Sequence, residues 1–298
     1  MSGLYNSVKR NCKLFFKDKG MFFSSLITPV ILLVLYVLFL AKVFKGNFTD
    51  ALEGIEVSEK LVNGFVAAQL SSSLLAVCCI TVAFCSNFIM VQDKVTGARG
   101  DLFITPAKSY IHALAYYIAT AVTTLIVCLT AYIGCLIYMA CMGWYMSAGE
   151  VFALLGDIVL LVMFGTAMSS VINFFLTSQG QISAVGTVVS AGYGFICGAY
   201  MPIAFFGNVL QNILGFFVGT YGTSVVRVHA MGGIFEEMAS LGWNGEIIEG
   251  IKDSVDANLY FFGNKVELWA CYLVLALGIA VLVAVYVLLN IFYKKKGR

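Results

Sequence analysis

Six apolar stretches, each of about 20 residues or more, run through the sequence and decide what kind of fold it can adopt. An α-helix rises 1.5 Å per residue, so about 20 apolar residues cross the roughly 30 Å hydrocarbon core of a bilayer. With 60% hydrophobic and 11% charged residues, the chain has too little polar surface to coat a water-soluble globule. The sequence therefore predicts an all-α polytopic membrane protein with a single transmembrane domain over residues 1–298. The six predicted spans are 21–41, 65–91, 111–142, 151–176, 182–201 and 268–293.

Charged residues separate the loops into two groups. Lysine and arginine gather in the N-terminal segment, in the loop 92–110 and in the tail, whereas aspartate and glutamate predominate after the first span and in the segment 202–267. Cytoplasmic loops of membrane proteins carry the excess of basic residues. Six crossings with both termini in the cytoplasm satisfy this rule, and we expect a multi-pass protein of the plasma (inner) membrane. The net charge of +2 gives no indication of nucleic-acid binding.

The first 20 residues combine a basic side and an apolar side. Leu4, Val8 and Phe15 recur at helical spacing, and Lys9 and Lys13 fall on the opposite side. This pattern predicts an amphipathic helix over residues 1–20 that lies in the cytoplasmic membrane interface. Two roles remain open for it: an anchor to the lipid bilayer alone, or in addition a surface that touches a cytosolic partner.

The segment after the fifth span is apolar enough to enter the bilayer, but we do not expect it to cross. Residues 203–219 are rich in Ile, Leu, Val and Phe, yet Asn208, Gln211 and Asn212 would be costly in lipid without partners. A seventh crossing would also place the basic tail outside. We therefore predict a re-entrant or interfacial helical element that begins at Pro202, within an extracellular segment 202–267.

The sequence contains no motif for nucleotide hydrolysis or for metal catalysis. It lacks the phosphate-binding pattern GxxxxGK[ST] and the zinc pattern HExxH, and its two histidines are His112 and His229. The nine cysteines lack CxxC spacing and fall mostly in predicted spans, which favours a packing role. The chain is therefore predicted not to be an enzyme itself, and to bind no metal and no cofactor.

Asp157 is the one carboxylate placed well inside a predicted span. A charge in the bilayer is costly, so its side chain is expected to face protein or a wet cavity. Glu150 precedes it on the same helix face, and the two carboxylates together could attract a cation or a substrate amine. The other interpretation is a structural hydrogen bond from Asp157 to a neighbouring span.

Two predicted spans carry stripes of small or weakly polar residues, with aromatic residues nearby. Such stripes let helices pack closely, or they line a cavity through which cargo slides, and both uses can coexist at a subunit interface. The candidate substrate-pathway residues from these stripes, their aromatic neighbours and the buried carboxylate are Gln69, Ser73, Phe84, Asn87, Phe88, Asp157, Thr187, Ser190 and Tyr193.

Two segments carry motifs of a known family. Residues 92–106 read QDKVTGARGDLFITP, an acidic and basic cluster followed by a glycine, a leucine-containing turn and Thr-Pro. Residues 196–227 read ICGAYMPIAFFGNVLQNILGFFVGTYGTSVVR, with a glycine turn, a proline, Leu-Gln, Thr-Tyr and a downstream arginine. Both segments resemble the membrane subunits of type-2 ATP-binding-cassette (ABC) transporters. The chain departs from that pattern where Gln92 and Asp93 replace the usual glutamate, and where prolines are missing around 206–207 and at Val218.

The resemblance implies a permease that pairs with a second permease subunit, as a homodimer or a heterodimer, above two cytosolic ABC ATPase subunits that bind ATP and Mg. The loop after the second span would be the coupling element, and the second and fifth spans would flank the pathway. The coupling residues that it implies are Asp93, Lys94, Gly97, Arg99, Leu102, Thr105 and Pro106. The outer-gate residues that it implies are Gly198, Pro202, Gln211, Tyr221 and Arg227.

The resemblance favours an exporter, and the weakly polar stripes with nearby aromatics favour an amphipathic drug, lipid or peptide as cargo. The alternative from another class is an ATP-independent channel or ion-coupled carrier that uses Asp157 as its ion site. The two hypotheses differ in whether an ATPase accompanies the chain.

Overall fold

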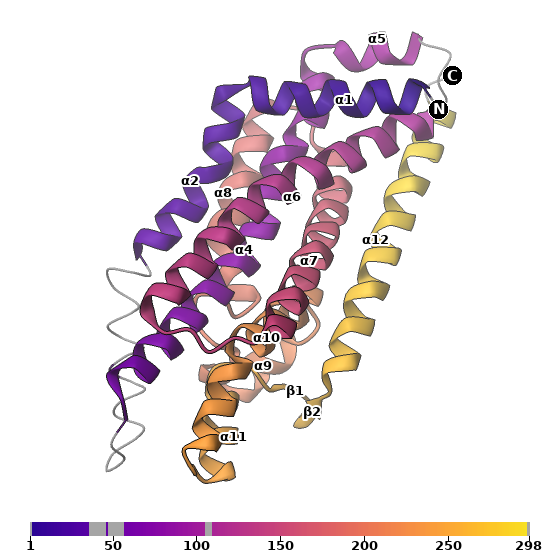
Figure 1. Cartoon of the computed structure of the whole chain (residues 1–298). Helices are drawn as coiled ribbons and strands as arrows, with labels where there is room; N and C mark the ends of the chain where they lie inside the picture. The colour runs from indigo at the N-terminus through magenta and orange to yellow at the C-terminus, as the bar shows by residue number, and fades with distance from the viewer. Residues whose placement is uncertain (1, 36–45, 47–56, 105–108, 297–298) are drawn as a thin grey trace.

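The chain folds as a bundle of long helices with one short β-hairpin (Figure 1). The structure is a computed structural model that describes residues 2–35, 46, 57–104 and 109–296. Its α-helices are α1 (Ser2–Lys17), α2 (Lys19–Leu35), α4 (Glu59–Val95), α5 (Ala98–Ile104), α6 (Ser109–Met142), α7 (Ala148–Phe175), α8 (Gln179–Ile196), α9 (Asn208–Leu214), α10 (Val218–Ser240), α11 (Gly245–Ser254) and α12 (Leu268–Lys296). A 3₁₀ turn, η2 (Ile203–Phe205), precedes α9, and the strands β1 (Leu259–Phe261) and β2 (Asn264–Val266) pair antiparallel.

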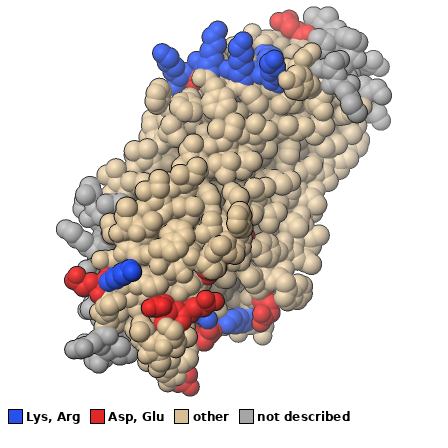
Figure 2. All heavy atoms as spheres, in the orientation of Figure 1, with Lys and Arg blue, Asp and Glu red and all other residues tan. Residues whose placement is uncertain are grey.

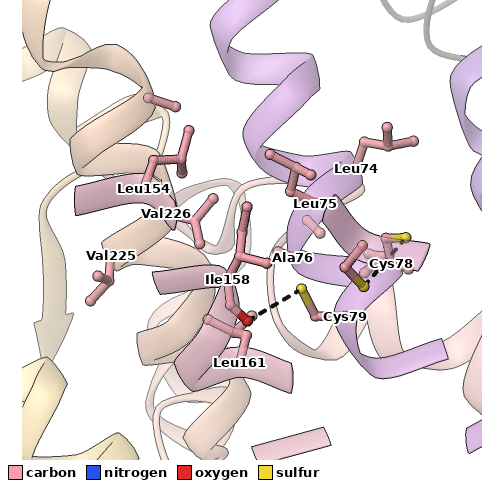
Figure 3. Close-up of a cluster of buried hydrophobic side chains, with 14 of the residues drawn as sticks. Leu74, Leu75, Ala76, Cys78, Cys79, Leu154, Ile158, Leu161, Val225 and Val226 are labelled. Carbon is pink, nitrogen blue, oxygen red and sulfur yellow. Dashed lines mark hydrogen bonds between the residues drawn. The ribbon is translucent and has the colours of Figure 1, made fainter. Parts of the chain in front are cut away.

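Helix α4 is the central element of the bundle. It has 37 residues, and buried residues lie on all of its sides along most of its length. A helix that is apolar all round is buried by other helices rather than exposed on one face. Helices α2, α6, α7, α8 and α10 all pack against α4. Figure 3 shows the apolar packing where α4 meets α7 and α10, with Leu75, Ile158 and Val225 among the residues that fill it.

The cysteines in this core are packing residues. Cys79 and its neighbour Cys78 lie on α4 within the cluster of Figure 3. The Cys79 thiol lies 3.9 Å from the Ile158 carbonyl oxygen, and the Cys78 and Cys128 sulfurs are 4.0 Å apart without a bond between them. This agrees with the packing role that their spacing favoured.

Four of the described helices are long and apolar enough to cross a bilayer, namely α4, α6, α7 and α12. They contain the predicted spans 65–91, 111–142 and 268–293 and nearly all of 151–176. A fifth candidate is the pair α9 and α10, if this pair, which is bent by 95°, is counted as one span. Helix α2 covers the first part of the predicted span 21–41, and residues 36–41 lie outside the described part of the chain.

The fifth predicted span, 182–201, ends earlier than expected. Helix α8 has 18 residues, stops at Ile196 and is not among the four candidates. Gly198 has a φ of +74°, and the backbone N–H groups of Ala199 and Tyr200 both donate to the Gly194 carbonyl. A positive φ is costly for residues with a Cβ, so this glycine terminates the helix and turns the chain toward Pro202.

The segment predicted to be re-entrant is a short helix followed by a long one. Within 203–219 the chain forms η2 and α9 and then turns into α10, a 23-residue helix that packs on α4, α7 and α12. A helical segment was predicted here, but the length of α10 and its burial were not. Its glycines and its charged residues Arg227, Glu236 and Glu237 keep its hydropathy below that of the spans, although most of its residues are buried.

Charge sorts to the two ends of the bundle. Figure 2 shows lysine and arginine side chains in a row at the end where α1 lies, mostly acidic side chains at the end where α11 lies, and an uncharged belt between them. The belt has the character expected of a surface in contact with lipid. The protein is a multi-pass membrane protein, and its two ends are called here the α1 end and the α11 end.

Candidate functional site

Two groups of predicted functional residues lie at opposite ends of the bundle. The predicted coupling residues follow α4 at the α1 end, and the predicted gate residues surround η2, α9 and α10 toward the α11 end. The predicted pathway residues lie on α4, α7 and α8 between these ends.

The turn between α4 and α5 is built around Gly97. Helix α4 ends with Thr96 as its C-cap, and Gly97 follows with a φ of +81°, a conformation that favours glycine. The seven-residue helix α5 follows directly. The segment after the second span thus forms a helix–turn–helix.

Asp93 ties this corner to α1 and α6. Its Oδ2 accepts a hydrogen bond from Arg10 Nη1 at 2.7 Å, and its Oδ1 accepts one from Arg10 Nη2 at 3.0 Å. The Tyr116 hydroxyl donates to Oδ2 at 2.5 Å. The hydrogen bond to Asp93 raises the pKa of Arg10 above its ordinary value, so the guanidinium stays charged. Because Asp93 is buried, it positions the corner from within and does not present its carboxylate to a partner.

Lys94 points the other way and binds the end of α7. Its ammonium donates to three backbone carbonyls, those of Asn173 (3.1 Å), Phe174 (2.5 Å) and Leu176 (3.0 Å). The last carbonyls of a helix have no partner within the helix, and a lysine at that end satisfies them and complements the helix dipole. The adjacent residues Asp93 and Lys94 therefore fix one corner to two different parts of the bundle.

The remaining coupling residues are arranged around α5. The Arg99 guanidinium lies 6.0 Å from the Phe174 ring, so it faces the bundle. Leu102 is half-buried, whereas Gly100 and Asp101 are exposed. Thr105 and Pro106 lie outside the described residues. The exposed surface of this corner therefore includes Gly97, which the motif singled out, together with Gly100 and Asp101, which it did not.

Asn87 joins three helices at the centre of the bundle. Its Nδ2 lies 3.1 Å from Ser169 Oγ and 3.0 Å from Ser170 Oγ on α7, and its Oδ1 accepts from Thr120 Oγ1 on α6 at 3.3 Å. Hydrogen bonds between polar side chains hold membrane helices together. Of its aromatic neighbours on α4, Phe84 is buried and Phe88 is half-buried.

Asp157 is held by protein on both of its oxygens. His229 Nδ1 lies 2.6 Å from Oδ2, and the Tyr272 hydroxyl donates to Oδ1 at 2.6 Å. These contacts join α7, α10 and α12, which is the structural hydrogen bonding that the sequence left open. Glu150, the second carboxylate of the alternative interpretation, accepts from the backbone N–H and the hydroxyl of Ser147, as part of the capping box that begins α7.

The two stripes of small residues differ in burial. Gln69 and Ser73 of α4 are buried, whereas Thr187 of α8 is exposed. Ser190 is half-buried, and its backbone carbonyl accepts from the Tyr200 hydroxyl at 2.9 Å, while Tyr193 is buried. Whether any of these residues touches cargo stays a prediction.

The predicted gate residues are connected by hydrogen bonds to the backbone. Gln211 Nε2 donates to the carbonyls of Ala204 (3.2 Å) and Phe206 (2.8 Å). The Tyr221 hydroxyl donates to the Gly215 carbonyl at 2.7 Å. Pro202 is buried at the entry to η2. These contacts help to fold the segment between α8 and α10 into a compact unit.

Arg227 is fully buried and gathers distant segments around its guanidinium. Nη1 donates to Asp256 Oδ2 at 3.0 Å, and Nη2 donates to the Gly198 carbonyl at 2.5 Å and to Ser73 Oγ at 3.2 Å. Asp256 also accepts from the backbone N–H groups of Ile203 (2.6 Å) and Ala204 (3.0 Å). Sequence reasoning missed Asp256, since nothing in the spacing of the two residues links it to Arg227.

Across the described ranges, no group of three or more His, Cys, Asp or Glu side chains is arranged to hold a metal ion. In comparisons with known proteins, the family model described as ABC-2 type transporter matches residues 3–230. The match runs from α1 into α10 and thus includes both the coupling corner and Arg227, while Asp256 and α12 lie beyond it. No curated protein matches the chain.

Proposed function

Because the chain belongs to the ABC-2 type transporter family, we propose that it is the transmembrane subunit of an ATP-driven exporter whose energy comes from separate cytosolic ABC ATPase subunits. The observation that carries the proposal is the corner after α4. Two adjacent, oppositely charged residues fix it to α1, α6 and the end of α7, while its exposed residues stay free to meet a partner.

The α1 end is the cytoplasmic end in this proposal. Lysines and arginines gather there, and acidic residues gather at the α11 end, which follows the distribution of membrane proteins with basic cytoplasmic loops. Both termini are then cytoplasmic, with six crossings if α2 and α8 each contribute one. The protein would lie in the plasma membrane, with η2, α9, α10, α11 and the hairpin toward the outside.

Coupling follows from the contacts of Asp93 and Lys94. A partner that docks on Gly100 and Asp101 of α5 pushes on a corner that is tied to α1 through Arg10 and to the α7–α8 connection through Lys94. Rigid helices joined in this way transmit a displacement along the bundle. ATP and Mg bind to the partner ATPase, and the chain itself contributes positioning and the pathway.

The pathway and the cargo are proposed from the exposed side of α8 and the residues near it. The exposed side of α8, with Thr187, faces away from the bundle and suits contact with a second permease subunit, homo- or heterodimeric. Weakly polar and aromatic residues near that side favour an amphipathic drug, lipid or peptide, and the segment around Pro202 and Arg227 would gate its exit. The ATP-independent carrier is not favoured, because both Asp157 oxygens are engaged by His229 and Tyr272.

Purification from native membranes tests the proposal. The tagged chain is expected to retain an ABC ATPase in mild detergent, with ATP hydrolysis in the eluate. Replacing both Gly100 and Asp101 with arginine should remove the ATPase without unfolding the chain, because both positions are exposed on α5. Glu246→Arg, exposed on α11, is the matched control and should retain it. Transport by the lone chain in liposomes, with no ATPase present, would overturn the proposal.

A further inference from the structure

We propose that Arg227 is a two-position latch, bound to Ser73 in the state seen here and transferred one helical turn along α4 to Gln69 when the outer segment moves. The inference rests on the proposed function, since it assigns the moving contact of the predicted outer gate. It concerns residues of this chain alone and names no cargo.

The present position of Arg227 holds several segments together. Its guanidinium bonds Ser73 of α4, the Gly198 carbonyl after α8 and Asp256 before β1. Asp256 in turn binds the backbone at the start of η2. A displacement of α10 along α4 therefore has to break the bond to Ser73 and give the guanidinium another partner, because a buried charge without partners is costly.

Gln69 is placed to be that other partner. It lies four residues before Ser73 and so on the same face of α4, one turn closer to the α11 end. Its side chain is fully buried, and within the described part of the chain neither its Nε2 nor its Oε1 has a hydrogen-bond partner. The Arg227 Nε is likewise without a partner there. A buried amide and a buried N–H group that both lack partners in one state are expected to find them in another.

The sequence of α4 allows this exchange in one direction only. The residues one turn from Ser73 on the other side are Ala76 and Val77, which offer no side-chain acceptor. A shift of α10 toward the α11 end would bring the guanidinium to the Gln69 Oε1, whereas a shift toward the α1 end would leave it without a side-chain partner on α4. Asp256 keeps its two backbone donors in either case. A transfer by one helical turn leads from one packed arrangement to another, with no stable arrangement between them.

A purely structural interpretation makes the opposite prediction for Gln69. If Gln69 were only an imperfect packing residue, then Gln69→Leu would remove an unpaired buried amide, stabilise the chain and leave activity unchanged. If the latch is correct, Gln69→Leu should have an equal or higher Tm and yet lower the ATP hydrolysis of the purified complex in nanodiscs at least tenfold. Ser71→Ala is the matched control. Ser71 is also buried on α4, but it lines a cavity with Leu33 and Cys135.

The outcomes separate the latch from the proposed function. A wild-type complex without ATPase would refute the proposed function, whereas a coupled wild type together with a fully active Gln69→Leu variant would refute the latch alone. If Gln69→Leu does not fold, the latch is decided by spin labels at Glu59→Cys on α4 and Glu236→Cys on α10, two exposed positions, in a Cys141→Ser background. Trapping the complex with ATP and vanadate should shift their separation by about 5 Å, close to one helical turn. An unchanged separation would overturn the latch.

Discussion

Each end of the bundle contains an arginine–aspartate pair, and the two pairs differ in burial. Arg10 and Asp93 at the α1 end have side chains that are 33% and 8% exposed, whereas Arg227 and Asp256 toward the α11 end are 0% and 7% exposed. A partly exposed pair can open to water at modest cost, while breaking a buried pair leaves a desolvated charge. The pair at the α1 end is therefore the easier one to separate when a partner docks. The buried pair favours a change between two defined arrangements, because intermediate positions leave its charges unpaired.

The largest loss of stability is expected when Asp256, the acidic member of the buried pair, is removed. Asp256→Ala leaves the fully buried Arg227 without its counter-charge, and we expect a destabilisation of about 3–5 kcal/mol. The expected result is a sharply lower Tm or failure to purify as a monodisperse species. Asp253→Ala is the control, because Asp253 is half-buried and accepts hydrogen bonds from Asn258 and Tyr260 but pairs with no buried arginine. A loss of unfolding free energy below about 1 kcal/mol would show that breaking the buried pair is no more costly than breaking an exposed one.

The second effect concerns the α1 end. Lys94→Met removes three charge-assisted hydrogen bonds to the end of α7, and we expect a loss of about 1.5–3 kcal/mol, because hydrogen bonds to charged groups contribute that much. The measurement is thermal unfolding of the purified chain. Lys13→Met on α1, where the side chain is exposed, should leave the Tm unchanged. Equal losses for the two variants would contradict the role given to Lys94.

A smaller loss of stability is expected for a variant of the Asp157 site, which lies between the two ends. Tyr272→Phe removes the hydroxyl that donates to Asp157 Oδ1 but keeps the ring and the His229 contact, and the expected cost is about 1 kcal/mol. Tyr260→Phe is the comparison, because its hydroxyl donates to Asp253 at an exposed site. Ion flux through liposomes in Tyr272→Phe but not in Tyr260→Phe would make Asp157 an ion site.

The smallest effect is a pH dependence at the α11 end. Hydrogen bonds from Lys252, Lys265 and Asn258 lower the pKa of Glu249 from 4.5 to about 2. A carboxylate with a lowered pKa contributes stability above its ordinary pKa, and this contribution is lost as pH falls from 4.5 toward 2. Because the Glu249 side chain is 48% exposed, the contribution is small. The protection of residues 249–266 against hydrogen exchange, taken relative to the intrinsic amide rate at each pH, should fall in that range, and less so in Glu249→Gln.

Hydropathy and charge were sufficient to predict where the long helices lie in the sequence. The regions assigned to α4, α6, α7 and α12 agree with the predicted spans because apolar length is a property of the local sequence. The end of α8 was placed too late, because the spans were bounded by hydropathy and the chain stays apolar past Gly198, where the positive φ stops the helix. The length and burial of α10 were missed because a helix buried among other helices can carry an arginine that lipid would not accept.

The sequence did not indicate what its candidate residues contact. Asp93 and Lys94 were identified from a motif as coupling residues, but the motif carries no information on the direction of their side chains, and both turn toward the bundle. Arg227 was identified while Asp256 was not, since their contact depends on how the chain returns after α11. Contacts between distant segments follow from packing, which no local pattern encodes.

The most direct test of the account is photo-crosslinking from α5 in native membranes. A photoreactive amino acid at Asp101, which is exposed at the proposed cytoplasmic end, should capture an ABC ATPase subunit that mass spectrometry identifies. The same amino acid at Glu246, exposed at the opposite end, should capture none. Capture of an ATPase from position 246 and none from position 101 would contradict the orientation and the coupling role together.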